Sequence, residues 1–165
     1  MFEKVKKFVD SSFFGKKIHF ERTVYWLKKL KPDADEAMQI AAYAHDIHRA
    51  FNKLPKGFRK DITSPDYLKK HQEGGAQIIS ELLEKLRHPK EEIKRIAEMI
   101  RLHEEGGTTE ADLIKDADSL SYFEVNVPKH IEKFGKKLVK KMFMKKYKFM
   151  FERISSKKAK ELAYP

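Results

Sequence analysis

The sequence predicts an all-α protein, a compact single-domain helical bundle of about seven helices. No stretch shows the sustained alternation of β-branched and polar residues that marks a strand. Apolar residues instead recur at steps of three and four along nearly the whole chain, which is the periodicity of amphipathic helices. The length of 165 residues is close to that of one domain, and 41% of the residues are hydrophobic. We therefore expect one core and one domain spanning residues 1–165.

Caps and breaks bound the expected helices. Pro32 ends one helix, and Asp33 or Asp35 can cap the next. Thr109 can cap a later helix, and residues 53–65 are rich enough in Pro and Gly to predict an irregular loop. The expected helices span residues 4–14, 18–30, 37–51, 66–87, 89–103 and 110–124, followed by a basic helical segment at 128–162.

Composition limits both the chemistry and the compartment. The chain has no Cys, which excludes disulfides, thiolate catalysis and Cys-ligated zinc. No run approaches the roughly 18 apolar residues that a transmembrane helix needs. We therefore expect a cytoplasmic protein. Few amides beside abundant Lys and Glu form a thermophile-like composition.

The net charge of +11 lies entirely in the C-terminal segment. Residues 129–160 contain thirteen Lys and Arg and two acids, whereas the rest of the chain is balanced. Apolar residues recur from Ile131 to Phe151 and predict a helix with a wide apolar stripe. We expect this stripe to dock on the core while the lysines stay solvated. The alternative is an electrostatic platform for a polyanion such as a nucleotide, a nucleic acid or an acidic lipid surface.

The helix expected at 37–51 is apolar nearly all round, which predicts that it lies at the centre of the bundle. It nevertheless carries His45 and Asp46 side by side. An ionised Asp in a dry interior is costly unless it is paired or bound to a metal. Adjacent helix positions lie about 100° apart, so both side chains can reach one ion. A structural alternative is that Asp46 caps a neighbouring helix or pairs with Arg49 or Arg22.

Three more histidines lie at positions expected to face inwards. His19 opens the helix before the central one, while His71 and His103 lie on the apolar stripes of two later helices. Any one of them alone is more often a core residue than a ligand. Together with His45 and Asp46 they predict a metal centre, since imidazoles and carboxylates suit Fe, Mn, Co, Ni or Zn.

Asp116 and Asp118 flank the apolar face of the helix expected at 110–124. They lie on opposite sides of that face, so only one of them should reach a given site. Spacing alone does not choose between them.

The order of these residues resembles the HD superfamily of metal-dependent phosphohydrolases. The resemblance covers about residues 18–124 and implies that family's helical fold for this core. The family's last ligand is the Asp of an Ala-Asp-x-Leu run, which here favours Asp118. The segments that carry the resemblance are IHFERTVYWLKKL, AAYAHDIHRAF, YLKKHQEGGAQII, IRLHEEGG and LIKDADSLSYF.

The resemblance implies a role for each residue. One or two divalent ions would activate water for hydrolysis of a phosphomonoester or phosphodiester, for instance in a nucleotide. His71 and His103 would assist catalysis or hold a second ion, and Lys115 and Arg49 would meet the substrate phosphate unless they are solvated surface cations. The implied metal ligands are His19, His45, Asp46 and Asp118.

The sequence departs from the family pattern at two places, and each limits the role or substrate that the resemblance implies. His48 stands where many relatives have Gly, and its place near the centre of an apolar face favours a packing role. No Gly-Tyr-Pro triplet follows His103, which disfavours cyclic-di-GMP hydrolysis. A rival interpretation is a binding module whose basic C-terminal helix docks nucleic acid or a protein partner.

Overall fold

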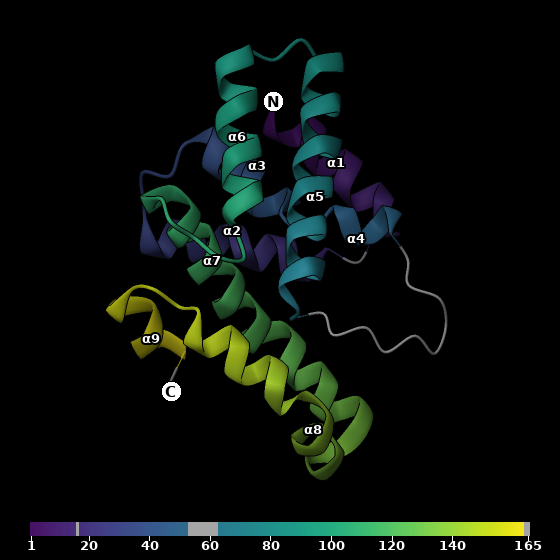
Figure 1. The fold of residues 1–165 in the computed structure, drawn as a ribbon, viewed down its shortest axis with the longest axis vertical. Helices are drawn as coiled ribbons and strands as arrows, with labels where there is room; N and C mark the ends of the chain where they lie inside the picture. Colours follow the sequence, from purple (N-terminus) through teal and green to yellow (C-terminus); the bar gives the residue numbers. More distant parts are fainter. Residues whose placement is uncertain (16, 53–62, 164–165) are drawn as a thin grey trace.

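The protein is described here by a computed structural model that covers residues 1–15, 17–52 and 63–163. These ranges contain helices and no strand, which confirms the predicted all-α bundle (Figure 1). Most of the loop predicted at 53–65 lies outside the described residues. The elements are α1 (Phe2–Ser12), α2 (Ile18–Leu30), α3 (Glu36–Ala44), α4 (His48–Phe51), α5 (Pro65–Lys85), α6 (Lys90–Leu102), α7 (Thr109–Ser121), the π-helical η1 (Tyr122–Asn126), α8 (Val127–Glu152) and α9 (Lys157–Ala163).

Helix α3 forms the centre of the bundle, as its composition predicts. It packs against α1, α2, α6 and α7, and its residues from Ala37 to Ala44 are buried except Gln39. Asp35 caps the helix, because its carboxylate accepts a hydrogen bond from Met38 N at 3.0 Å. Large, fully buried apolar side chains of α2, α5, α6 and α7 complete this core: Leu27, Ile79, Leu83, Ile96, Met99, Ile100 and Ile114.

The single helix predicted at 37–51 is wrong, because a tight turn separates α3 from α4. Ile47 N donates to Ala44 O and Arg49 N donates to Asp46 O, each at 2.9 Å, so these bonds span three residues rather than four. Such 3₁₀-like tightening within a helical stretch is frequent at functional positions. The turn places His45 and Asp46 between α3 and α4 instead of within a single continuous helix.

Helices α5 and α6 form an antiparallel pair beside this junction (Figure 1). His48 packs its ring against α5 where Gly74 leaves room, and a Cβ at position 74 would lie 2.3 Å from His48 Cδ2. His48 therefore has the packing role predicted for it.

The effect of Gly74→Ala on the free energy of unfolding is expected to depend on residue 48, with a loss of stability beside His48 and a gain once His48→Ala is present. In the native background the added methyl meets the His48 ring, and overpacking of this kind costs about 1–3 kcal/mol. With His48→Ala in place the clash is gone, and better helix propensity should stabilise the protein by about 1 kcal/mol. Urea unfolding of the four proteins in this cycle measures the difference. Equal effects of Gly74→Ala in both backgrounds would contradict the packing assignment.

Helix α7 begins one residue earlier than its predicted cap implies, since Thr108 rather than Thr109 accepts the bond from Ala111 N at 3.2 Å. At its other end α7 widens into the π-helical turn η1 before α8 begins. Short π-helical segments inserted in α-helices are frequently found at functional sites.

The C-terminal basic segment is a helical hairpin followed by α9, and not one helix with a continuous stripe. Gly135 reverses the chain within α8, with φ 72° and ψ 152°, a backbone conformation that favours glycine. The His130 and Phe143 rings stack with centroids 4.3 Å apart, whereas a straight helix would separate these residues by about 20 Å. The second arm therefore returns to the body of the bundle (Figure 1). Among the described helices, none is both long and apolar enough to span a membrane.

Candidate functional site

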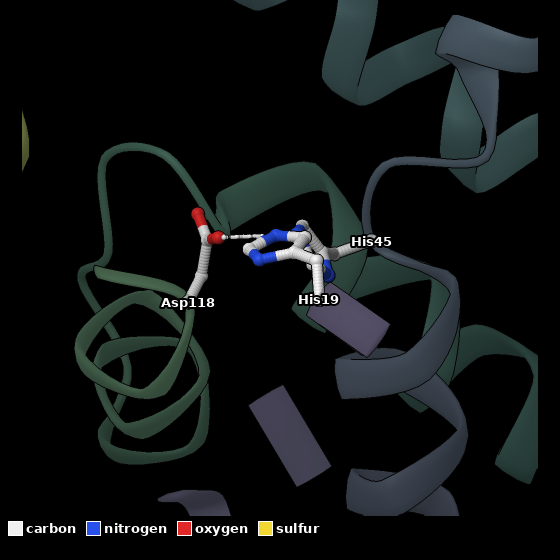
Figure 2. A group of neighbouring side chains, drawn as sticks. All are labelled: His19, His45 and Asp118. Atoms are coloured by element: carbon white, nitrogen blue, oxygen red, sulfur yellow. Dashed lines mark ion pairs between the residues drawn. The ribbon is translucent and has the colours of Figure 1, made fainter. Parts of the chain in front are cut away.

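Two imidazoles and a carboxylate meet where α2, α3 and α7 adjoin (Figure 2). Asp118 Oδ1 lies 3.0 Å from His19 Nε2 and 3.3 Å from His45 Nε2. His45 is fully buried and Asp118 is nearly so. One ligand atom from each of the three residues falls within 4.8 Å of the others, which is a spacing that a metal ion can bridge.

A second group of the same kind adjoins the first. His71 Nε2 of α5 lies 3.0 Å from Asp46 Oδ1, and His103 at the end of α6 completes the group. Asp46 Oδ1 is also 3.9 Å from His45 Nε2, and the His45 and His103 ring centroids are 5.2 Å apart. The structure thus brings together six of the predicted site residues: His19, His45, Asp46, His71, His103 and Asp118.

Oxygen partners on the Nδ1 side orient three of the imidazoles. His45 Nδ1 lies 2.8 Å from Ala42 O and His103 Nδ1 lies 2.7 Å from Ile100 O. A carbonyl oxygen only accepts, so Nδ1 carries the proton in both rings. Ser121 Oγ donates to His19 O at 2.8 Å and thus accepts from His19 Nδ1 at 2.9 Å. In their neutral forms all three rings therefore present an Nε2 lone pair to the cluster.

The pKa values of the buried imidazoles shift in opposite directions, because neighbouring carboxylates dominate at His45 and burial dominates at His103. Burial alone would lower the pKa of His45, but Asp118 and Asp46 outweigh it and raise this pKa to about 9. Burial lowers the pKa of His103 to about 3, so that ring is neutral. Although burial would raise the pKa of Asp118, Arg153 and His45 hold it well below its usual range. Asp46 and Asp118 therefore hold a proton on His45 at neutral pH, and a metal ion bound by His45 would take the place of that proton.

Three cations, from α4, from α8 and from the residue that follows α8, surround this cluster. Arg49 Nε lies 3.0 Å from Asp46 Oδ1, and Arg153 pairs with both Asp118 and Glu104. Lys146 is 9% exposed and lines a cavity of about 40 Å³ beside the cluster. The residues that line this cavity are His19, Asp46, Arg49, Asp118, Tyr122, Asn126, Lys146 and Met150.

The other predicted phosphate ligand lies elsewhere. Lys115 is buried, and its Nζ donates to Glu105 O at 3.1 Å and to Asp112 Oδ1 at 2.8 Å. It closes the turn before α7 and does not line the cavity. The choice that spacing left open is also resolved, since Asp116 accepts hydrogen bonds from the backbone of Ser155 and Ser156 while Asp118 faces the histidines.

Sequence reasoning missed Glu104, Ser121, Lys146 and Arg153. Arg153 had one available signal, because it is the single Arg among the thirteen bases of residues 129–160. Arg suits fixed pairing with carboxylates better than Lys does. Lys146 had no such signal, because the chain reversal at Gly135 decides which lysines face the body.

The chain was compared with known families, curated proteins and solved structures. A family described as a domain of unknown function, DUF4202, matches residues 6–164. The chain belongs to the DUF4202 family. No curated protein and no solved structure matches it. The DUF4202 match spans both the histidine-bearing helices and the C-terminal hairpin, so the two parts belong to one family unit.

Proposed function

We propose that this DUF4202 protein is a metal-dependent phosphohydrolase that cleaves a phosphomonoester or phosphodiester. The observation that carries the proposal is the convergence of three Nε2 lone pairs, each fixed by an oxygen on Nδ1, with Asp46 and Asp118. The ordered HD-type motif from His19 to Asp118 supports the same reading by resemblance.

The donor set fits a divalent ion. His45 Nε2 and His103 Nε2 are buried without a hydrogen-bond partner among the described residues, so both nitrogen atoms are available to bind a metal. Ligands bound at about 2.1 Å lie at most about 4.2 Å apart, close to the spread seen in each group. His19, His45 and Asp118 would hold one ion, and Asp46, His71 and His103 would hold a second. The resemblance also makes Asp46 a ligand of the first ion, and its Oδ1 lies 3.9 Å from His45 Nε2. A mixture of imidazole and carboxylate ligands suits Mn, Fe, Co, Ni or Zn.

When bound, such an ion would supply Lewis-acid activation of water and would neutralise charge on the phosphoryl oxygens. Water adds to phosphorus as the bond from phosphorus to the alcohol oxygen breaks. One proton of the water ends on the leaving alcohol and the other stays on the phosphate. His103 has a free Nε2 that can hold a second ion or accept a hydrogen bond from water or substrate, whereas its low pKa disfavours a proton staying on the ring.

Metal analysis of protein purified without chelator tests the proposal. We expect at least one divalent ion per chain, or uptake of Mn, Fe, Co, Ni or Zn by metal-free protein measured by calorimetry. The loaded protein should hydrolyse members of a panel of phosphomonoesters and phosphodiesters, and a chelator should stop it. Protein that binds none of these metals and stays inert after their addition would refute the proposal.

A second candidate function is nucleic-acid binding by the hairpin in α8. Its favouring observation is that exposed lysines on the second arm stand beside exposed apolar side chains, with Leu138, Met142 and Met144 exposed by 43%, 44% and 48%. Such a surface can contact phosphates and unstacked bases together.

Neutralising four hairpin lysines is expected to flatten the salt dependence of any such binding. The change is Lys→Gln at Lys136, Lys137, Lys140 and Lys141, all exposed. On duplex DNA, the slope of log K against log salt is negative, and each lost phosphate contact reduces its magnitude by about 0.9. Fluorescence anisotropy with labelled RNA and DNA across a salt series measures it. The control carries the same four changes at exposed lysines of other helices: Lys28, Lys70, Lys85 and Lys90. Equal slopes in both variants, or no binding at low salt, would exclude this candidate.

A further inference from the structure

We propose that Lys146, together with Arg49, forms a subsite for the phosphoryl group of a phosphomonoester dianion. This inference rests on the proposed function, because it assigns the substrate class of the same site. It also gives part of the C-terminal hairpin a role in the reaction rather than in solubility.

The position of Lys146 is the first observation. It lies on the returning arm of the hairpin, is 9% exposed and lines the cavity with Arg49, Asp46 and Asp118. Its Nζ stands 4.7 Å from the Phe149 ring centroid and 6.0 Å from that of Tyr122. Among the described residues, no carboxylate lies within 4.0 Å of this Nζ, in contrast to Arg49 and Arg153. A buried ammonium over aromatic rings that has no paired carboxylate is suited to receive an anion.

The cavity contains further polar groups. Asn126, in the π-helical turn, lines it and has a buried side-chain oxygen without a partner in the described part of the chain. Depending on its orientation, the Asn amide can donate a hydrogen bond to a phosphate oxygen or accept one from a protonated phosphate.

The charge balance identifies the anion. Three carboxylates (Asp46, Glu104 and Asp118) face three cations (Arg49, Lys146 and Arg153), so these side chains cancel when the imidazoles are neutral, as imidazoles bound to a metal are. Burial lowers the pKa of Lys146 to about 8, which still leaves it mostly protonated at pH 7. One divalent ion would leave an excess of two positive charges. A phosphomonoester carries close to two negative charges at this pH, because its second pKa is about 6. A phosphodiester carries one.

The size of the cavity agrees with that charge. At about 40 Å³ it has room for a few water molecules, far below the roughly 300–1,000 Å³ of sites that enclose a small-molecule ligand. A terminal phosphoryl group can enter it while the rest of the substrate stays outside. A diester would have to bring a substituent in on each side of phosphorus.

Binding of inorganic phosphate to the metal-loaded protein tests the subsite without relying on turnover. Calorimetry should detect phosphate binding that depends on the metal. Lys146→Met keeps a long apolar side chain in this place and should weaken phosphate binding at least about tenfold, since a hydrogen bond to a charged group is lost. Lys148→Met removes the same charge two residues away, where the side chain is 73% exposed, and should bind phosphate as the native protein does. Lys146→Arg keeps the charge and should recover most of the binding.

Two substrates with the same leaving group separate the ester classes. p-Nitrophenyl phosphate should be hydrolysed in preference to bis(p-nitrophenyl) phosphate, and Lys146→Met should lower kcat/KM more for the monoester. Metal content and thermal unfolding of each variant show whether it is loaded and folded. A metal-loaded Lys146→Met protein that binds phosphate as tightly as the native one overturns the subsite and leaves the proposed hydrolase standing, as does preference for the diester. Absence of metal binding in the native protein overturns both.

Discussion

Replacing Asp118 with Asn is expected to remove metal binding and hydrolysis together. Asp118 Oδ1 stands between His19 Nε2 and His45 Nε2, so it is the anionic member of the first ligand group. In metalloproteins, mutation of a residue that only hydrogen-bonds to a metal ligand already lowers metal affinity by about 10–100-fold. We therefore expect a loss of more than about a hundredfold when this ligand itself becomes a neutral amide. Calorimetric titration of metal-free protein measures the affinity.

The matched control for this variant is Asp116→Asn, which makes the same chemical change two residues away on α7. Asp116 faces the backbone of Ser155 and Ser156 and touches none of the clustered histidines in the contacts described. It should keep native metal stoichiometry. Because Asp118 also pairs with Arg153, urea unfolding of both metal-free variants separates an effect on folding from an effect on the ligand set. Undiminished metal uptake by folded Asp118→Asn would contradict the ligand assignment.

Replacing Asp116 with Ala should produce the largest loss of stability among the acidic side chains of α7. The side chain is 1% exposed and accepts from Ser155 N at 2.7 Å and from Ser156 N at 2.9 Å. These two bonds tie the chain between α8 and α9 to the body. Each hydrogen bond to a charged group contributes about 1.5–3 kcal/mol, so we expect the free energy of unfolding to fall by about 3 kcal/mol.

Urea denaturation with linear extrapolation measures this change. Asp33→Ala is the control, since its side chain is 82% exposed and its pair with Lys31 lies on the surface. It should change the free energy of unfolding by less than about 0.5 kcal/mol. A loss below about 1 kcal/mol in Asp116→Ala would show that the 153–156 turn is held by other contacts.

Most of the helices were predictable, because burial along one helix repeats every 3.6 residues and leaves its mark in the local sequence. Helices α2 and α6 agree with their predicted spans within one residue. The predictions failed where backbone geometry departs from a regular helix. The turn at His45–Ile47 and the reversal at Gly135 both lie inside stretches whose apolar spacing is helical on either side.

The sequence by itself determined the helical class, the buried centre at α3 and the set of histidines and aspartates that lie on inner faces. Periodicity is sufficient for this, since it reports which side of each helix is buried. It does not report which buried side chains of different helices meet. Spacing left Asp116 and Asp118 open and the family resemblance favoured Asp118, but only the tertiary structure shows Asp118 beside the histidines and Asp116 on the backbone of Ser155 and Ser156.

The same distinction applies to the excess charge. Sequence located all of it in residues 129–160 and predicted a solvated lysine face. In the folded chain most of these lysines are exposed, but Lys146 and Arg153 are brought to the cluster by the reversal at Gly135. The physical reason is that a charge acts on the groups near it in space, and a single glycine at positive φ decides which groups those are.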